Sequence, residues 1–326
     1  MTELTYVDAA HEALHEELTR DPDVWAIGED LGRGGVFGQY RGLQSEFGSD
    51  RVVDAPISEA CMLGAAVGAA MMGTRPVVEM RVSDFSLCAT DELVNQAAKA
   101  RYMFGGQSRV PLVVRKPFGM WRSSAAQHSQ SLEAWYAHIP GLVVVTPAFP
   151  RDEKALLKAA IRCDDPVVFL EHKNLWSTSG DPGFDDPPAE IGRARIVRKG
   201  DALTIVSWSA ALHDCLAAAA TLASESSIEV EIIDLRTIWP WDLDTVLASA
   251  HRTRRILVVH EAVSVAGFGA EVVATVSERL FGRLVTPPKR LGAPRIPVSY
   301  SPTLEDQVRV NPARIVGTVK HMLAHE

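Results

Sequence analysis

The sequence predicts an α/β protein built from two doubly wound domains, each with a mostly parallel sheet. Short apolar runs rich in β-branched residues alternate with longer, Ala-rich segments of helical pattern. The runs are apolar at consecutive positions, as expected of strands that are buried on both faces of a parallel sheet. The chain of 326 residues is also long enough for two domains.

The expected strands and helices follow one another along the whole chain. The strands are expected at 76–78, 111–114, 142–145, 166–170, 203–206, 228–233 and 256–259. The helices are expected at 58–73, 87–104, 151–162, 210–225 and 266–280, with a last one near 312–325. This alternation requires right-handed crossover connections between parallel strands.

One stretch, at 177–188, is rich in Ser, Gly, Asp and Pro and interrupts this alternation. Such composition is typical of a connection between domains. We therefore expect a first domain over 1–185, a linker over 186–200 and a second domain over 201–326.

Charge and composition exclude several classes of protein. The net charge of −8 and the pI of about 5.7 disfavour binding to nucleic acid or to an anionic membrane. The four cysteines form no CxxC pair, which argues against a disulfide framework or a common zinc site and favours a reducing compartment. The N-terminus resembles neither a secretory nor a transit signal, and no apolar stretch is long enough for a membrane span. We expect a cytoplasmic protein.

Glu59 is the first candidate for chemistry. Pro56 favours an extended approach to the helix expected at 58–73, and Ser58 can cap that helix. The helix is apolar all round, so we expect it to be buried. A carboxylate in its first turn can simply be favoured by the helix dipole. Alternatively, a desolvated Glu59 has a raised pKa and can share a proton with a ligand.

Two further candidates follow expected strands. Phe85 comes shortly after one strand, where it could stack on a flat ring or simply be a core residue. His128 lies in the irregular segment 119–130 and could relay protons near neutral pH. No G-x-S-x-G elbow is present, which argues against Ser129 as a nucleophile paired with His128.

These segments belong to an ordered set of motifs. The set comprises Gly28-Glu29-Asp30, Asp54-Ala55-Pro56-Ile57-Ser58-Glu59, Ser83-Asp84-Phe85, His128-Ser129-Gln130-Ser131, His138-Ile139-Pro140-Gly141-Leu142, Ile233-Asp234-Leu235-Arg236-Thr237, Val259-His260-Glu261 and the segment from Pro297 to Asp306. In this order the motifs resemble the β subunit of the thiamine-diphosphate-dependent decarboxylase component of 2-oxo acid and acetoin dehydrogenase complexes. The resemblance covers nearly the whole chain.

The resemblance implies a pyrimidine-binding domain followed by a transketolase C-terminal-type domain. It implies that Glu59 hydrogen-bonds a ring nitrogen of the aminopyrimidine of thiamine diphosphate. It stacks Phe85 on the same pyrimidine ring and makes Ile57 a further cofactor-binding residue. It also makes His128 an active-site residue that orients the substrate or transfers a proton.

The family's metal–diphosphate motif begins with Gly-Asp-Gly, which this sequence lacks. The resemblance therefore implies that the chain holds only the pyrimidine half of the cofactor. An α subunit would supply the Mg²⁺–diphosphate site in an α₂β₂ heterotetramer. The C-terminal domain would dock on a lipoyl acyltransferase core.

The resemblance also places a potassium ion in the β subunit. Its matching positions are Leu112, Ala160, Ile161, Cys163 and Asp165, most of which would bind through backbone carbonyls. Cys163 departs from the acidic residue expected at that position.

The leading hypothesis is a catalytic β subunit that decarboxylates a 2-oxo acid and passes the acyl group to lipoamide. The run from Ala126 to Gln130 resembles the acetoin branch, in which acetoin is cleaved without decarboxylation. Trp121 and Arg122 stand where glycines are usual, which leaves the substrate open. Two more hypotheses are a carboligase that has no lipoyl partner and a non-catalytic scaffold subunit.

Overall fold

Two units of structure divide the chain. The structure is a computed structural model that describes residues 3–180 and 189–324. Unit 1 comprises Met1–Phe118 and Trp135–Ile191, and unit 2 comprises Gly119–Ala134 and Gly192–Glu326. The boundary after Ile191 falls within the expected linker, whereas part of the turn-rich stretch lies outside the described residues. Segment Gly119–Ala134 packs with unit 2, although the sequence places it within the expected first domain.

The core of unit 1 is a parallel sheet with the order β6-β7-β5-β4-β2-β3. Its strands are β2 (Val24–Gly28), β3 (Val52–Asp54), β4 (Arg75–Glu79), β5 (Val113–Phe118), β6 (Val143–Val145) and β7 (Val167–His172). The central strands β5 and β7 are buried at every position. Their apolar runs predict this burial, but Arg115, Lys116, Glu171 and His172 are buried with them. The strands β1 (Leu4–Thr5) and β8 (Ser179–Gly180) form a separate antiparallel pair.

Helices cover this sheet. The long ones are α1 (Tyr6–Arg20), α3 (Glu59–Met71) and α6 (Pro150–Arg162), and the shorter ones are α2 (Leu43–Phe47), α4 (Ala98–Met103) and α5 (Glu133–Ala137). The Thr5 side chain caps α1 by accepting a hydrogen bond from the Asp8 amide at 3.1 Å. The apolar faces of α1 and α6 pack together over the sheet core. The segment expected as one helix over 87–104 is divided into the short helices η2 (Phe85–Ala89), η3 (Glu92–Ala97) and α4.

Unit 2 contains a second sheet, with the order β14-β13-β10-β11-β9. Its strands are β9 (Arg195–Arg198), β10 (Thr204–Ser207), β11 (Glu231–Asp234), β13 (Ile256–Val263) and β14 (Lys289–Ala293), and β12 (Thr237–Trp239) is a further short strand. All pairings are parallel except that of β9 with β11.

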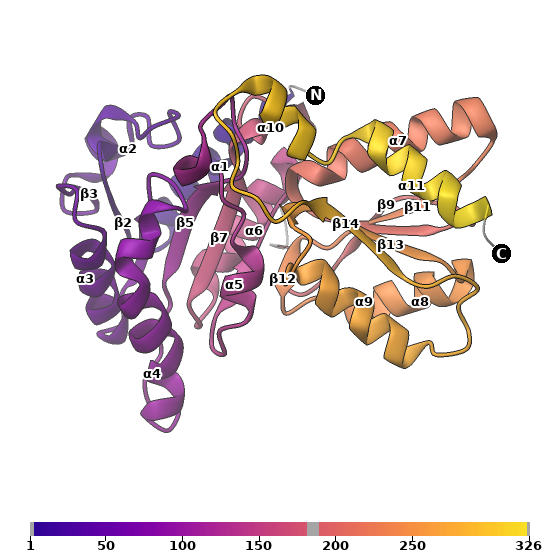
Figure 1. Cartoon of the computed structure of the whole chain (residues 1–326). Coiled ribbons are helices and arrows are strands. Elements are labelled where there is room, and N and C mark those ends of the chain that lie inside the picture. Colours follow the sequence, from indigo (N-terminus) through magenta and orange to yellow (C-terminus); the bar gives the residue numbers. More distant parts are fainter. Residues whose placement is uncertain (1–2, 181–188, 325–326) are drawn as a thin grey trace. The chain divides into compact units, whose positions relative to one another are not determined.

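Figure 1 shows α7 and α11 on one face of this sheet and α8 and α9 on the other. The helices of unit 2 are α7 (Ser209–Ser226), α8 (Leu243–Thr253), α9 (Phe268–Arg279), α10 (Pro302–Val308) and α11 (Pro312–Ala324). The expected doubly wound architecture is confirmed in both units.

Two expectations about α3 need correction. Ser58 is the N-cap residue, but its hydroxyl donates to the Pro56 carbonyl at 3.0 Å instead of capping the helix. The helix is also not fully buried, because Cys61, Ala65 and Gly68 form an exposed stripe along one side. An apolar sequence cannot distinguish burial in the chain's own core from a surface that is left for a partner.

Candidate active site

Glu59 opens α3 at one end of the unit 1 sheet. Strand β3 ends at Asp54, and the Pro56 turn leads directly into the first turn of the helix. The side chain of Glu59 is half-buried. Ile57, two residues before it, is 78% exposed, so its side chain does not contribute to the core of unit 1. Ile57 and Glu59 therefore lie at the carboxyl end of a parallel strand, where open α/β sheets bind their ligands.

Glu29 is a second carboxylate at this sheet edge. It follows β2, which lies between β3 and β4 in the sheet. Burial raises the pKa of Glu29, and the negative charge of Glu59 raises it further, while Arg81 acts in the opposite direction. The strands approach closely here: a Cβ added to Gly28 would lie 2.8 Å from the Cβ of Glu79. Glycine at this position therefore allows β2 and β4 to pair closely just before Glu29.

Phe85 begins the short helix η2 after the neighbouring strand β4, and its side chain is half-buried. A buried lysine fixes this turn, since Lys116 Nζ donates to Ser86 Oγ at 2.9 Å and to Tyr136 Oη at 3.1 Å. Burial lowers the pKa of Lys116. Glu29, Glu59 and Phe85 thus follow three adjacent strands, β2, β3 and β4, so the structure brings the expected carboxylate and aromatic residue to one edge of unit 1.

His128 is exposed and ends the short helix η4 (Ala126–His128), within the loop Gly119–Ala134 of unit 2. Two carboxylates of that unit hold the loop. Glu261 Oε1 accepts hydrogen bonds from the Met120 amide at 2.7 Å and from Ser131 Oγ at 3.2 Å. Glu305 Oε2 accepts one from the Ser123 amide at 2.9 Å. We call Glu261 and Glu305 the loop clamp.

The backbone of this loop is strained. Arg122, Ser123 and Ala125 have φ values of 45°, 59° and 62°, a region that favours glycine. The ψ of −170° at Ala125 places that residue in a conformation that is almost restricted to glycine. The loop therefore keeps the backbone shape of a glycine-rich run without its glycines, and the clamp compensates for that strain.

The loop ends beside a buried aromatic stack. Trp208 Nε1 donates to Glu133 Oε1 at 3.3 Å, and the Trp208 ring stacks on His260 at a centroid distance of 5.3 Å. Burial raises the pKa of Glu133 to about 7 and lowers that of His260 to about 4. His260 is therefore neutral near pH 7, whereas Glu133 changes its charge there.

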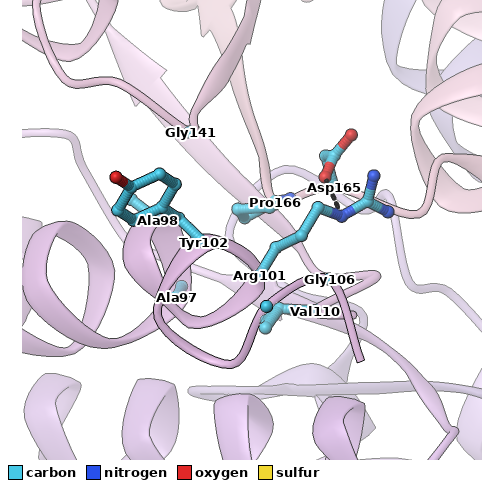
Figure 2. Close-up of a pocket in the computed structure, with 10 residues that line it drawn as sticks. Ala97, Ala98, Arg101, Tyr102, Gly106, Val110, Gly141, Asp165 and Pro166 are labelled. Carbon is cyan, nitrogen blue, oxygen red and sulfur yellow. Dashed lines mark ion pairs between the residues drawn. The ribbon is translucent and has the colours of Figure 1, made fainter. Parts of the chain in front are cut away.

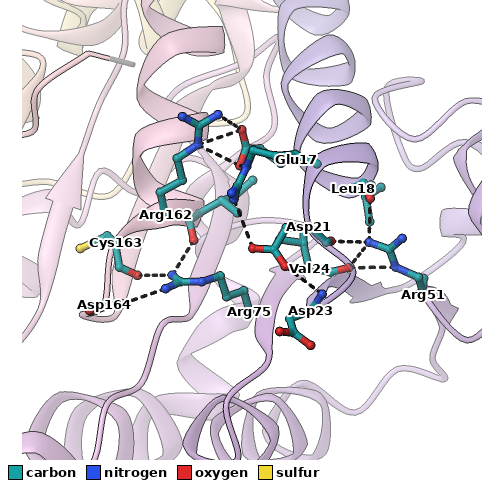
Figure 3. A network of polar contacts seen from close by, with 12 residues as sticks. Glu17, Leu18, Asp21, Asp23, Val24, Arg51, Arg75, Arg162, Cys163 and Asp164 are labelled. Carbon is teal, nitrogen blue, oxygen red and sulfur yellow. Dashed lines mark hydrogen bonds and ion pairs between the residues drawn. The ribbon is translucent and has the colours of Figure 1, made fainter. Parts of the chain in front are cut away.

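The residues implied for potassium lie in unit 1, in and around the turn that follows α6. Arg75 Nη1 donates to the carbonyl oxygens of Ile161 and Cys163, both at 3.1 Å, and Arg75 Nη2 pairs with Asp164 at 2.8 Å (Figure 3). An arginine thus already supplies positive charge to two of the five implied positions.

The other implied potassium positions have partners as well. The Leu112 carbonyl accepts from the Val167 amide at 2.8 Å, and the Ala160 carbonyl accepts from the Cys163 amide at 3.1 Å. Asp165 pairs with Arg101 at 3.0 Å beside a mainly apolar cavity of about 450 Å³ (Figure 2). These groups thus have partners within the chain. The potassium site stays a prediction, and we derive no step from it.

Membrane spans and metal clusters are both absent from the described part of the chain. Every helix within residues 3–180 and 189–324 is too short or too polar to cross a bilayer. The same described residues contain no cluster of three or more His, Cys, Asp or Glu side chains that could hold a metal ion.

Sequence reasoning gave no role to Glu29, Glu261 or Glu305. Glu29 and Glu261 lie in the motifs Gly28-Glu29-Asp30 and Val259-His260-Glu261, and membership of those motifs was the signal that could have found them. Glu305 lies in the C-terminal motif, but nothing in its sequence neighbourhood indicates a contact with residue 123.

Two family models match the chain. Residues 2–178 match "Transketolase, pyrimidine binding domain", and residues 192–315 match "Transketolase, C-terminal domain". A solved structure described as "Split gene transketolase, inactive beta4 tetramer" superposes with a TM-score of 0.81 at 19% identity and covers 99% of both chains. That likeness shows the fold alone.

Three curated relatives are similar over nearly the whole chain. The β subunit of acetoin:2,6-dichlorophenolindophenol oxidoreductase of Cupriavidus necator is 43% identical, over 96% of this chain and 95% of its own. The β subunit of 2-oxoisovalerate dehydrogenase of Bacillus subtilis is 39% identical, over 99% of both chains. The β subunit of the pyruvate dehydrogenase E1 component of Rhizobium meliloti is 42% identical, over 98% of this chain and 70% of its own.

Proposed function

Because this chain belongs to the family of transketolase-type β subunits of 2-oxo acid and acetoin dehydrogenases, we propose that it is the pyrimidine-binding half of a thiamine-diphosphate-dependent enzyme. The observation that carries the proposal is the half-buried Glu59, placed beside Glu29 and the Phe85 turn at one sheet edge. When bound, thiamine diphosphate supplies a nucleophilic carbon and an electron sink for cleaving the bond next to a carbonyl group.

The residues of this edge have roles that suit such a cofactor. Glu59 shares a proton with a ring nitrogen, and partial exclusion of water strengthens that hydrogen bond. The Phe85 ring provides a flat apolar surface for a heteroaromatic ring. The negative charge of Glu59 acts on Glu29 through space, so this second carboxyl group holds its proton to a higher pH than an isolated one.

His128 is our candidate for orienting the substrate or transferring a proton to it. Its side chain is exposed in unit 2, and the loop clamp fixes the backbone on which it lies. We assign Glu261 and Glu305 as positioning residues, because they contact the loop backbone rather than a substrate.

An α subunit would supply the Mg²⁺–diphosphate half of the site. The exposed stripe of α3, formed by Cys61, Ala65 and Gly68, supports this part of the proposal. Small side chains allow two helices to approach closely, and Met72, at 85% exposure, extends the apolar surface. The α₂β₂ stoichiometry and docking on a lipoyl acyltransferase core belong to the same proposal.

The test is co-expression with a candidate α chain, followed by a substrate panel of pyruvate, branched-chain 2-oxo acids and acetoin, with 2,6-dichlorophenolindophenol as the electron acceptor. We expect dye reduction that requires both chains, thiamine diphosphate and Mg²⁺. Release of CO₂ would mark a 2-oxo acid as the substrate, whereas acetoin would reduce the dye without CO₂. Acyl transfer to lipoamide in the same preparation separates a dehydrogenase subunit from a carboligase.

The proposal fails if an assembled complex reduces the dye with none of these substrates, as expected of a scaffold subunit. Micromolar or tighter binding of thiamine diphosphate by the isolated chain would contradict the division of the cofactor between two subunits.

A further inference from the structure

Three carboxyl groups and one guanidinium group meet in the core of unit 1. Arg115 lies on β5, Glu79 on β4, Glu171 on β7 and Glu153 in the first turn of α6. Each of these residues is at most 3% exposed. A buried charge is unfavourable unless an opposite charge accompanies it. The single guanidinium therefore cannot compensate three ionised carboxyl groups.

The guanidinium of Arg115 is divided between two of the three carboxyl groups. Its Nε and Nη2 donate to the two oxygens of Glu171 at 3.0 and 2.5 Å, and its Nη1 lies 2.9 Å from Glu79 Oε2. Glu79 also accepts hydrogen bonds from Tyr40 Oη and Gln39 Nε2, both at 3.1 Å. Glu171 and Glu79 thus have the donors that a buried anion needs.

Glu153 lacks such donors. Neither of its carboxyl oxygens has a donor at hydrogen-bonding distance in the described part of the chain. The Tyr6 hydroxyl of α1 is near enough to favour the anion, yet it donates to the Pro147 carbonyl at 3.3 Å. Lys154, the next residue of α6, pairs with two carboxylates of α1. An ionised Glu153 would therefore be a poorly compensated charge in the core.

The surrounding charges also favour the neutral form of Glu153. Burial raises the pKa of Glu153 well above its usual range, and the negative charge of Glu171 raises it further, while Arg115 and the Tyr6 hydroxyl act in the opposite direction. Burial also raises the pKa of Glu79, to about 7, despite its donors. Glu171, with both oxygens on the guanidinium, is then the carboxylate that balances Arg115.

We propose that Glu153 keeps a proton in the folded chain and that this proton locks α6 onto the sheet, so that unit 1 loosens when the proton is removed. Leu156, Leu157 and Ile161 of α6 belong to the apolar core, and Glu153 enters that core from the first turn of the same helix. Without its proton, Glu153 is an anion next to Glu171, and water has to enter the core to solvate it. The lock is a pH-sensitive device that does not depend on the proposed function.

The direction of the pH dependence follows from linkage. Because the folded state raises the pKa of Glu153 above the ordinary value of 4.5, the stability that its proton supplies is fully present below pH 4.5. That stability is lost as the pH rises through the folded value. Glu79 and, in unit 2, Glu133 change charge near pH 7 as well, so a variant of Glu153 is needed to isolate its contribution.

Infrared spectroscopy of the full chain in D₂O tests for the proton, because a protonated carboxyl group and a carboxylate absorb at different frequencies. Near pH 7 we expect a protonated-carboxyl band that is weaker in Glu153→Gln and unchanged in Glu278→Gln, an exposed control on α9. Glu171→Gln removes the negative charge that raises the pKa of Glu153, so the band of Glu153 should disappear at a lower pH in that variant.

Amide hydrogen exchange in α6 tests for the lock. After correction for the intrinsic exchange rate, the protection of α6 amides should fall at least about tenfold between pH 7 and pH 10, the factor that corresponds to one pKa unit. Glu153→Gln has nearly the same size and is neutral at every pH, so its α6 amides should stay protected. Glu278→Gln should behave as the unaltered chain does.

The inference is overturned if Glu153→Gln leaves the protonated-carboxyl band unchanged, or if α6 loses protection with pH as strongly in Glu153→Gln as in the unaltered chain. If Glu153→Gln does not fold, Glu153→Met replaces it in both measurements, since an unbranched apolar side chain suits the aliphatic neighbours. A band that disappears at the same pH in Glu171→Gln as in the unaltered chain would also contradict the proposal. None of these results depends on turnover, so the proposed function can stand or fail separately.

Discussion

Met120 and Glu261 are 141 positions apart in the sequence, yet the Met120 amide donates to Glu261 Oε1 at 2.7 Å. The same oxygen accepts a hydrogen bond from Ser131, near the other end of the loop. One carboxylate of unit 2 therefore holds both ends of the segment that contains His128. This relationship leads to the first prediction.

Glu261→Ala should release the loop, because two hydrogen bonds to a charged acceptor are lost, each worth about 1.5–3 kcal/mol. We expect about ten- to a hundredfold faster amide exchange at Met120 and a lower kcat in the assembled enzyme. Glu261→Gln keeps an acceptor oxygen and should restore much of the protection. Glu271→Ala on α9, which removes an exposed carboxylate bonded to Thr275, serves as control. Unchanged exchange at Met120 in Glu261→Ala would show that the clamp does not order the loop.

The strain at Ala125 leads to the second prediction. Its backbone conformation costs about 1–3 kcal/mol for any residue except glycine, whereas glycine adds about 0.4–1 kcal/mol of chain entropy to the unfolded state. Ala125→Gly should therefore stabilise the chain by about 1 kcal/mol, as measured by urea unfolding. Ala217→Gly, at an exposed position inside α7, should instead destabilise it by a similar amount. A loss of stability in Ala125→Gly would contradict the strained conformation.

Glu133 leads to a prediction on pH. Burial raises its pKa from an ordinary value of 4.5 to about 7, so the folded state favours the protonated form. The resulting stability, on the order of 3 kcal/mol, is fully present below pH 4.5 and is lost as the pH rises through 7. Glu133→Gln keeps the acceptor for Trp208 but cannot ionise, so its unfolding free energy should fall less between pH 5 and pH 8.

The control for this measurement is Glu278→Gln, which removes an exposed carboxylate on α9. Its pH profile should match that of the unaltered chain. If Glu133→Gln shows the same profile as well, the ionisation of Glu133 is not what makes stability depend on pH.

The sheets could be predicted from the sequence because a buried strand is indicated by the apolar pattern of a few consecutive residues. The run Val167-Val168-Phe169-Leu170 is apolar on both faces and became β7, a strand that is buried throughout. The candidate residue Phe85 could be placed for the same reason, since it follows the strand expected at 76–78. Glu59 could be placed only from its helix, because β3 is not among the expected strands.

The loop clamp could not be predicted, because its contacts join distant positions. Glu305 has the sequence context of an exposed acid in the first turn of α10, yet it accepts from the Ser123 amide. Helix α3 shows a second limit. Its residues are apolar on every side, so the sequence predicts burial but cannot say whether the partner surface lies in this chain or in another.

Glu59→Gln tests the central assignment. The amide keeps the size of the side chain but cannot share a proton in the same way, so turnover of the assembled enzyme should fall about 10²- to 10⁴-fold. The variant should still assemble with the α subunit. It should also lower the pKa of Glu29, because one of the two causes that raise it most is the charge of Glu59. Full activity in Glu59→Gln would remove this residue from the mechanism, and Glu278→Gln is again the matched control.

The stripe of α3 gives the last prediction. Ala65 lies on the exposed side of the helix between Cys61 and Gly68, where the α subunit is proposed to pack. Ala65→Arg adds a long charged side chain that costs little in the free chain, since the position faces water, but it clashes and leaves an unpaired charge within an interface. We expect unchanged thermal stability of the isolated chain and at least a tenfold loss of affinity for the α subunit. Ala217→Arg, at an exposed position of α7, should leave assembly intact. If Ala65→Arg assembles normally, the exposed side of α3 is not the surface that binds the partner, and the division of the cofactor site between two chains would need another interface.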